Sequence, residues 1–368
     1  MNKMKILHIH PSLKSGGIEA MICALANEMA NHGHNVTVCS IYEPSEKDQF
    51  WHKLSPSVKK CSLGKHKGEN PIVTLYKIWR FLGKNQFDAI HMHGFFFYYL
   101  PTIFTKRKHN LFYTVHNDAY QENVLYDAYI VRLKKYAFSQ GLIHAITISE
   151  QSKASFEELY HCSNRMIVNG TTRPVIKDYC DIINQQHFSS STKVFLNPAR
   201  ITKQKNQIVL VNVFKRLIDE GYDIALLIAG DMQDKAIYSE LTPFFSNRII
   251  YLGTQNDIPN ILAHVDALVL PSLWEGLPVS LLEALSVGCI PICSPVGGVI
   301  NVVKDNFNGI LSSDSSELGF YEALMRYLNT GESELKCMKH NCIESFNKYD
   351  IKNTAREYID YYRSIGNS

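Results

Sequence analysis

Short apolar segments of strand length alternate with longer segments of helical periodicity along almost the whole chain. In the first half, the strand-like segments are residues 4–10, 35–41, 58–63, 89–93, 111–115 and 142–148. Between the first two, apolar residues at positions 18, 21, 22, 25 and 29 keep helical spacing until Gly33, which suits a helix end. Strands that alternate with helices in this way favour an α/β fold with a doubly wound parallel sheet.

The alternation stops after Asn169 and Gly170, where residues 171–192 are polar and rich in turn-forming residues. A second α/β series follows, with strand-like segments at 193–198, 223–230, 248–252, 267–271 and 290–294. We therefore expect two domains, residues 1–175 and 176–348, and a C-terminal helix over 349–368 that could pack back on either of them. A length of 368 residues fits two domains with a cleft between them.

Composition argues against a membrane-spanning or nucleic-acid-binding protein. The apolar runs fall well short of the ~20 residues that span a bilayer, and a net charge of +3 is too small to indicate nucleic-acid binding. The first residues lack the apolar region and cleavage site of a signal peptide, so we expect a cytoplasmic protein. The nine cysteines are scattered without a CxxC pair and are expected to be reduced thiols.

Two glycines mark a candidate anion site. Gly16 and Gly17 stand between the first predicted strand and the helix that follows it. Glycine lets a ligand approach the backbone closely, and the free amides and partial positive charge of a helix start favour an anion such as phosphate. The alternative is a simple turn, because the GxGxxG pattern of dinucleotide-binding enzymes is absent.

Two cations follow the first predicted strand of the second domain. Arg200 and Lys205 would lie at the carboxyl edge of the sheet, where open α/β sheets bind ligands, and could hold a diphosphate there. The alternative is two surface cations at a helix start. No two aspartates are separated by a single residue, so the DxD pattern that carries a divalent ion in other sugar-nucleotide enzymes is missing. We therefore expect no metal and no other cofactor.

Two glutamates bracket a short predicted helix in the stretch EGLPVSLLE. Pro278 suits the first turn of this helix and Gly288 its end, which places Glu283 ~7.5 Å along the axis, and Glu275 in the preceding turn. Each carboxylate can accept hydrogen bonds from hydroxyls at a different end of a ligand that carries a sugar or ribose. Otherwise the two glutamates are ordinary solvated acids.

EGLPVSLLE resembles the E-x7-E signature of the retaining GT-B glycosyltransferases. The order of motifs is similar to that of glycosyltransferase family 4 over essentially the whole chain: SGGIE, HMHG, YTVHND, ITISE, VNGTT, ARITKQKN, AGD, YLGTQNDI and LPSLWEG. The resemblance implies a GT-B fold, in which two Rossmann-like domains face each other across a cleft. It implies a retaining, metal-independent hexosyltransferase that uses a nucleotide-sugar donor, with a UDP-sugar favoured over a GDP-sugar. The acceptor would be a glycan or lipid-linked glycan in polysaccharide, lipopolysaccharide or glycolipid biosynthesis.

The resemblance also implies roles for single residues of the donor site. Glu283 would bind the ribose hydroxyls, and Glu275 would hold the transferred sugar together with the residues after it, Gly276, Leu277 and Pro278. Arg200 and Lys205 would neutralise the leaving diphosphate with the amides of Gly16 and Gly17. His116 in TVHN would reach the donor sugar near the reacting carbon. The implied catalytic group is thus His116, Arg200, Lys205 and Glu275.

Other segments complete the implied donor pocket, and some positions depart from the family pattern. Thr254 in YLGTQNDI would lie where the base is cradled, and Gly297 with Gly298 would close the pocket. Thr172 and Asn301 stand where the family more often has an acid, so neither is given a charged role. His91 and His93 are interpreted as strand-end histidines packed under a loop in preference to acceptor contacts, and Asp231 as a helix or turn cap.

The aromatic run GFFFYYLPTIF precedes the basic residues Lys106, Arg107 and Lys108. This segment could dock on the inner face of the cytoplasmic membrane beside a lipid-linked acceptor, or form a buried helix behind the cleft, which we favour.

Three rival activities are a sugar-nucleotide 2-epimerase, a nicotinamide dehydrogenase and a non-catalytic sugar-binding protein. The order of the two glutamates argues against the epimerase, and the absent dinucleotide fingerprint argues against the dehydrogenase. The presence of Glu275, Arg200 and Lys205 argues against a non-catalytic protein.

Overall fold

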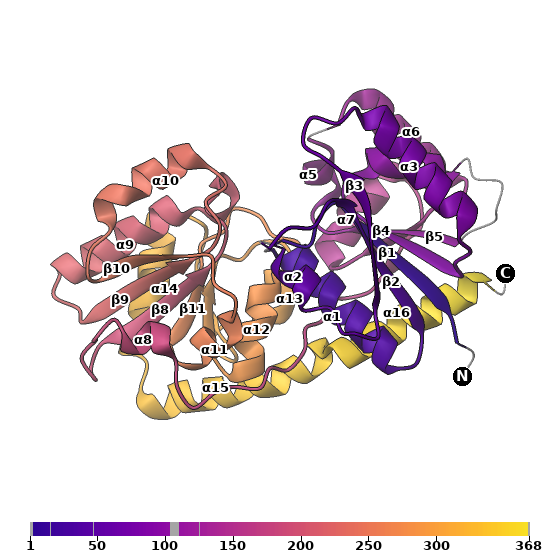
Figure 1. Ribbon diagram of the computed structural model, residues 1–368. Coiled ribbons are helices and arrows are strands. Elements are labelled where there is room, and N and C mark those ends of the chain that lie inside the picture. Colours follow the sequence, from indigo (N-terminus) through magenta and orange to yellow (C-terminus); the bar gives the residue numbers. More distant parts are fainter. Residues whose placement is uncertain (1–2, 15, 47, 104–109, 125, 367–368) are drawn as a thin grey trace. The chain divides into compact units, whose positions relative to one another are not determined.

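The computed structural model describes residues 3–14, 16–46, 48–103, 110–124 and 126–366. The chain forms two compact units. Unit 1 comprises residues 1–171 together with 351–368, and unit 2 comprises residues 172–350. Each unit is built on a parallel sheet with helices packed against it (Figure 1), which confirms the predicted pair of doubly wound α/β domains.

In the described part of unit 1, seven strands form one sheet in the order β3-β2-β1-β4-β5-β6-β7. Every pair in it is parallel. The order reverses between β1 and β4, so the carboxyl ends of these two strands flank a topological switch point, where open α/β sheets bind ligands. The strands are β1 (Lys5–His10), β2 (Asn35–Tyr42), β3 (Lys59–Lys65), β4 (Ala89–His93), β5 (Asn110–Val115), β6 (His144–Thr147) and β7 (Arg165–Met166).

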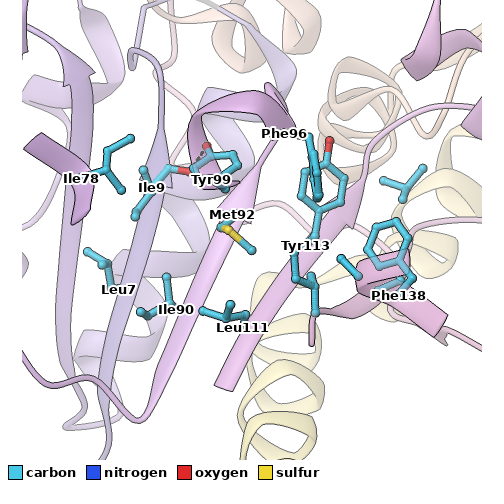
Figure 2. Packing of buried hydrophobic residues seen from close by; sticks show 14 of the residues in the cluster. Leu7, Ile9, Ile78, Ile90, Met92, Phe96, Tyr99, Leu111, Tyr113 and Phe138 are labelled. Atoms are coloured by element: carbon cyan, nitrogen blue, oxygen red, sulfur yellow. Dashed lines mark hydrogen bonds between the residues drawn. The ribbon is translucent and has the colours of Figure 1, made fainter. Parts of the chain in front are cut away.

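One hydrophobic core cluster of unit 1 lies on one face of this sheet. Side chains alternate between the faces of a strand, so Leu7 and Ile9 of β1 enter the core while His8 points to the opposite face. Figure 2 shows this packing, in which Leu7 and Ile9 are joined by residues of β4, of β5 and of the helical segments that cover them: Ile78, Ile90, Met92, Phe96, Tyr99, Leu111, Tyr113 and Phe138. The helical segments on this face include α3 (Pro71–Lys84), η1 (Phe96–Tyr99), α6 (Ala128–Ser139) and α7 (Glu150–Tyr160).

The opposite face of the sheet meets the last helix of the chain. Helix α16 (Ile351–Gly366) packs on α1 (Gly17–Asn31) and on β5, although it follows the whole of unit 2 in sequence. The ring of Tyr362 lies 4.6 Å from that of Phe112, and its hydroxyl lies 2.5 Å from Nδ1 of His91. The remaining helices of unit 1 are short: α2 (Gln49–His52), α4 (Leu100–Ile103) and α5 (Ala119–Asn123).

The aromatic run after β4 contributes to the core. Phe96 and Tyr99 in η1 are fully buried, and the Tyr99 hydroxyl donates to the carbonyl of Ile9. These contacts favour the interpretation of this run as a buried segment. Lys106, Arg107 and Lys108, which were the basic part of the membrane hypothesis, lie outside the described residues.

Unit 2 repeats the α/β plan with its own switch point. Its described strands form a sheet of six in the order β10-β9-β8-β11-β12-β13, again with parallel pairs. The order reverses between β8 and β11, so the loops that follow these strands meet at one edge. The strands are β8 (Lys193–Pro198), β9 (Ile224–Ala229), β10 (Ile249–Gly253), β11 (Ala267–Leu270), β12 (Ile290–Cys293) and β13 (Ile310–Leu311).

The helical segments of unit 2 surround this sheet and include the short helix expected after Glu275. Gly288 ends that helix, α12, with a left-handed backbone (φ 74°), as its sequence position predicts. The segments are α8 (Asp181–Asn184), η2 (Lys203–Lys205), α9 (Gln207–Asp219), α10 (Lys235–Leu241), η3 (Thr242–Phe244), α11 (Ile258–Ala263), α12 (Val279–Val287), α13 (Val299–Val302), α14 (Glu317–Asn329), α15 (Glu332–Phe346) and η4 (Asn347–Tyr349). Among the described residues of both units, no helix has the length and apolar character needed to span a bilayer.

Candidate functional site

The switch point of unit 2 carries an ion pair between two of the predicted site residues. Lys205 ends η2 in the loop after β8, and Glu275 lies in the loop after β11. Nζ of Lys205 is 2.6 Å from Oε1 of Glu275, and the Ser272 hydroxyl donates to the same oxygen at 2.6 Å. The loops on the two sides of the switch point are therefore joined through one carboxylate oxygen.

The environment of Glu275 leaves its second oxygen for another partner. The residue is 7% exposed, and Oε2 accepts no hydrogen bond from the described part of the chain. A buried carboxylate is stable only when it is paired or hydrogen-bonded, and Oε1 meets that need. Oε2 can accept a hydrogen bond from a ligand hydroxyl without disturbing the ion pair.

Close backbone contacts hold the Glu275 loop in place. The amide of Gly298 donates to the carbonyl of Gly276 at 2.6 Å. A Cβ atom at Gly297 would overlap the carbonyl of Glu275, and Gly297 has a left-handed backbone (φ 55°), so both the space and the conformation require glycine. The paired glycines that the sequence placed near the donor thus pack directly on the segment that carries Glu275.

Helix α12 places the second glutamate of the signature. Leu277 and Pro278 are buried, Pro278 is the N-cap, and the helix begins at Val279. Glu283 is half-buried on α12, four residues after the helix begins. Because the first amides of a helix have no partner within it, the start of α12 directly after Glu275 can also receive a ligand oxygen.

Two further predicted donor residues of unit 2 lie on the same carboxyl edge of the sheet. Arg200 follows β8 and is half-buried; its carbonyl accepts from Nε2 of Gln207, and its guanidinium has no partner among the described residues. Thr254 follows β10, the outer strand of the sheet, and is exposed. The structure therefore joins Lys205 to Glu275 directly, and among the described residues neither Arg200 nor Thr254 forms a hydrogen bond or ion pair with them.

In unit 1, the predicted residues also lie at the carboxyl edge. Gly16 is the N-cap of α1 and Gly17 its first residue, in the loop after β1; Ser15 lies outside the described residues. His116 follows β5 and is 6% exposed. Burial lowers the pKa of His116 to about 3, with a smaller effect from His10, so the imidazole is neutral near pH 7.

Two protein-family models match the chain. The model described as Glycosyltransferase Family 4 matches residues 15–171, and the model described as Glycosyl transferases group 1 matches residues 180–342. The two matches together span most of both units.

The chain belongs to glycosyltransferase family 4.

Two curated relatives of this glycosyltransferase are named as enzymes that act on lipid-linked sugars. The UDP-Gal:alpha-D-GlcNAc-diphosphoundecaprenol alpha-1,3-galactosyltransferase of Escherichia coli is 34% identical over 175 residues, 46% of this chain and 45% of the relative. The N,N'-diacetylbacillosaminyl-diphospho-undecaprenol alpha-1,3-N-acetylgalactosaminyltransferase of Campylobacter jejuni is 26% identical over 139 residues, 38% of this chain and 37% of the relative. The chain spans less than half the length of the curated relatives it matches.

Solved structures share the fold of the glycosyltransferase over its whole length. The crystal structure of HepE from Anabaena in complex with UDP and glucose superposes with a TM-score of 0.81. The alignment covers 98% of this chain and 100% of HepE at 17% identity. Together with the two parallel-sheet units, this likeness confirms that the fold is of the GT-B type.

The histidines of the HMHG motif are buried, as expected, but one of them contacts His116, a predicted site residue. Nδ1 of His93 lies 3.2 Å from Nε2 of His116. Nδ1 of His91 is hydrogen-bonded to the Tyr362 hydroxyl at 2.5 Å, and its Nε2 is hydrogen-bonded to Oγ1 of Thr114 at 2.6 Å. His91 therefore has a packing role against α16, whereas His93 supports the loop that carries His116.

Sequence reasoning missed a second support of the His116 loop. The carboxylate of Glu122 accepts the His116 amide at 2.7 Å and the Tyr113 hydroxyl at 3.2 Å. Its Oε2 lies 3.8 Å from Nζ of Lys134, which is 1% exposed and surrounded by the rings of Phe96, Tyr113, Tyr126 and Tyr160. Burial raises the pKa of Glu122, and the charge of Lys134 opposes that rise. The two residues lie on separate helices, so no periodicity in the sequence connects them.

Proposed function

We propose that the chain is a retaining glycosyltransferase that moves a hexose-type sugar from a UDP-sugar to a hydroxyl of a glycan carried by a lipid diphosphate. The observation that carries the proposal is the buried Glu275, tied to Lys205 across the switch point of unit 2 with one carboxylate oxygen left for a ligand. The names of the two relatives support a sugar-diphosphoundecaprenol acceptor, and the UDP complex of HepE supports the donor base.

The donor would be held mainly by unit 2. Glu283 binds the ribose hydroxyls, and Oε2 of Glu275 accepts a hydroxyl of the transferred sugar, beside Gly276, Leu277 and Pro278. The base lies near Thr254. Two cations, Arg200 and Lys205, and the amides of Gly16 and Gly17 stabilise the negative charge that grows on the leaving diphosphate. Such preorganised charge is usually the largest catalytic contribution in transfer reactions.

Retention would follow from attack on the same face that the diphosphate leaves, with a phosphate oxygen taking the proton of the acceptor hydroxyl. A double displacement needs a free carboxylate behind the anomeric carbon, as in retaining hydrolases. The Glu275 carboxylate does not fill this role in the proposed site, because its Oε1 is hydrogen-bonded to Lys205 and Ser272 and its Oε2 accepts a hydroxyl of the sugar. The alpha-1,3 products in the names of both relatives agree with retention from an α-linked UDP-sugar.

We also propose that no metal takes part in donor binding. The charge of a diphosphate can be balanced by Arg200, Lys205 and helix-start amides. The sequence has no pair of aspartates at DxD spacing, which a metal-dependent donor site would use. The test is direct, since EDTA removes a divalent ion without changing the protein.

The lipid-linked acceptor suggests that unit 1 contacts a membrane surface, and we place this contact on the outer faces of α3 and α6. Both helices pack on the same face of the sheet, and neither contains an acidic residue between its bounds. Their outward side chains are aromatic, aliphatic or basic: Ile72 (70% exposed), Val73, Tyr76 (56%), Trp79 (49%), Arg80, Lys84, Tyr129, Arg132, Lys135 and Tyr136. This combination suits an anionic bilayer surface, into which aromatic rings insert and toward which basic groups are drawn.

Two alternatives share the fold and remain distinguishable by their products. A UDP-sugar 2-epimerase-like enzyme would convert the UDP-sugar, and it would do so without an acceptor. A non-catalytic nucleotide-sugar-binding protein would bind UDP-sugar and release no UDP when the acceptor is present. Neither alternative explains the resemblance to enzymes that transfer a sugar to diphosphoundecaprenol-linked acceptors.

The proposal is tested by calorimetry and thermal shift with UDP, GDP, ADP and CMP, with and without EDTA. The wild type is compared with Glu283→Ala and with a control, Glu317→Ala, at an exposed position on α14. We expect UDP alone to bind tightly, EDTA to have no effect, and only Glu283→Ala to lose binding. UDP release from UDP-sugars is then measured with a sugar-diphosphoprenol acceptor. Absence of nucleotide binding, or equal binding by Glu283→Ala, rejects the proposal.

A further inference from the structure

Three histidines of unit 1 form a continuous chain that begins at a candidate site residue. Nε2 of His116 lies 3.2 Å from Nδ1 of His93, and Nε2 of His93 lies 3.2 Å from Nδ1 of His8. All three side chains are buried. At the inner end, Nε2 of His8 has no hydrogen-bond partner among the described residues. This hydrogen-bonded chain therefore runs from the sheet edge to the buried ring of His8, on the face opposite Leu7 and Ile9, and ends there.

Such a chain can run in only two directions, because a neutral imidazole carries one N–H and one lone pair. In the first, His116 donates from Nε2 to His93, His93 donates to His8, and His8 is left with an N–H that has no acceptor. In the second, His8 donates from Nδ1 to His93, His93 donates from Nδ1 to His116, and His8 keeps an unused lone pair. Burial keeps the three rings neutral: it lowers the pKa of His8 and His116 to about 3, and that of His93 well below its ordinary value.

The unpaired end decides between the two directions. A buried N–H without an acceptor is rarer in proteins than a buried acceptor with an unused lone pair, which favours the second direction. His91 does not alter this choice, although its ring centroid lies 4.0 Å from that of His93, because its own nitrogens bond Tyr362 and Thr114. In the second direction, Nε2 of His116 accepts from His93 and its proton resides on Nδ1.

We infer that His8 and His93 are positioning residues that fix His116 as a hydrogen-bond donor through Nδ1. His116 then donates a hydrogen bond to an oxygen of the transferred sugar and does not act as the base. This donor role rests on the proposed placement of His116 at the donor sugar. No covalent bond other than the N–H bond of the tautomer is concerned. The row of hydrogen-bonded histidines only selects which nitrogen of His116 carries the proton.

A neighbouring histidine has the complementary arrangement. His10 ends β1, and its Nδ1 lies 2.5 Å from the carbonyl oxygen of Ser12, which can only accept. His10 therefore carries its proton on Nδ1, and its Nε2 offers a lone pair when the ring is neutral. His10 and His116 both lie at the carboxyl edge of the sheet, and the charge of His10 contributes to the lowered pKa of His116. A donor on His116 and an acceptor on His10 match the two hydrogen-bonding functions of a hydroxyl group.

Nitrogen-15 NMR of protein labelled at histidine tests the inference on the wild type, without ligand or catalysis. Single substitutions, His116→Gln and His10→Gln, assign the resonances. We expect His116 to show a protonated Nδ1 and an unprotonated Nε2 near pH 7. A protonated Nε2 on His116 overturns the inference. Addition of Zn²⁺ is a further check, since His8, His91 and His93 have nitrogens within 4.8 Å of one another. If the nitrogen resonances of all three histidines shift together at one equivalent of Zn²⁺, the three form a metal site. That result would also overturn the inference.

The functional role is tested with His93→Phe, which removes the donor to Nε2 of His116. We expect the tautomer of His116 to change and the KM for the UDP-sugar to rise about tenfold, with binding of UDP unchanged because UDP lacks the sugar. The control is His91→Phe, which removes an equally buried ring outside the chain. If both variants lose UDP binding, the fold or the donor proposal has failed. If UDP binding persists and the tautomer and KM of His93→Phe equal those of the wild type, the positioning role is wrong.

Discussion

Lys205 and Glu275 are joined at 2.6 Å across the switch point of unit 2, although 70 residues separate them in sequence. The side chains are 15% and 5% exposed, so solvent screens the pair only partly. The ion pair ties the loop that follows β8 to the loop that follows β11. In the proposed enzyme, it couples the group that stabilises the leaving diphosphate to the group that holds the sugar.

This relationship predicts a large effect of Glu275→Gln. The amide keeps the bond to Ser272 but leaves the Lys205 ammonium without a counter-charge, and an unpaired charged group with limited exposure costs about 1–3 kcal/mol. We expect urea unfolding to show a loss in this range and activity to fall by at least 100-fold. The double variant Lys205→Met/Glu275→Gln should recover part of the stability and none of the activity. A single variant with wild-type turnover would exclude Glu275 from the donor site.

Glu283→Ala should weaken UDP binding and leave stability nearly unchanged. A hydrogen bond to a charged group contributes about 1.5–3 kcal/mol, which corresponds to a loss of about 10- to 100-fold in affinity. Glu283→Gln keeps the shape and one acceptor oxygen, so its loss should be smaller. Isothermal titration with UDP and with uridine separates contacts to the ribose from contacts to the phosphates: both ligands should be affected equally. A variant that loses UDP binding but keeps uridine binding would place Glu283 at the phosphates.

The Glu122–Lys134 pair in unit 1 predicts that removal of one partner is worse than removal of both. Glu122→Gln leaves the buried Lys134 ammonium with Asn123 and the surrounding aromatic rings, without a full counter-charge. Loss of one partner from a buried pair typically costs about 3–5 kcal/mol, while replacement of both partners is often nearly neutral. We expect Glu122→Gln/Lys134→Met to be more stable than Glu122→Gln in urea. Activity should stay low in both variants, because the His116 amide has lost a carboxylate acceptor. Equal stability of the single and double variants would show that the pair is not coupled.

The buried histidines predict a loss of stability in mild acid. The folded protein keeps His8 and His116 neutral down to about pH 3, whereas unfolded histidine binds a proton below about pH 6.5. Between these values the unfolded state holds more protons, so the free energy of unfolding falls as the pH falls, by about 1.4 kcal/mol per pH unit for each such histidine. Urea midpoints between pH 7.5 and 4.5 measure this slope. His8→Leu should reduce the slope by one proton. An identical slope for His8→Leu would show that His8 is charged in the folded state.

The fold could be predicted because its elements are local and strongly patterned. Strands such as β9 and β11 are continuous apolar runs, and α12 has a proline before it and a glycine at its end. The edge strands β7 and β13 were missed because two residues carry no periodicity. The place of α16 on unit 1 was left open because its apolar stripe fits any uncovered sheet face. The contacts of Tyr362 with His91 and Phe112 decide it only in three dimensions.

The candidate site could be predicted where its residues lie in one motif, as Glu275 and Glu283 do. The contacts that support the site join distant segments and left no such signal. Glu122 and Lys134 belong to no motif in the sequence, yet the fold brings them together as one buried pair. His93 was assigned to packing because a strand-end histidine is usually core, and only the fold brings its Nδ1 to His116. The ion pair of Lys205 and Glu275 was not foreseen, since each had been assigned to a different part of the donor.

The outer faces of α3 and α6 predict binding to anionic membranes through residues that the fold does not need. Tyr76 and Trp79 are about half exposed, with ring centroids 6.1 Å apart, and Arg80 and Lys84 lie exposed on the same helix. Each basic residue near an anionic surface contributes about 1 kcal/mol, so Arg80→Gln/Lys84→Gln should weaken binding to phosphatidylglycerol vesicles by roughly 30-fold. Tyr76→Ser/Trp79→Ser should weaken it through loss of ring insertion. The control Leu318→Ser/Lys336→Gln, exposed in unit 2, should bind as the wild type does. Wild-type binding by both α3 variants would reject the membrane surface, and a change in oligomeric state on light scattering would assign these helices to self-association instead.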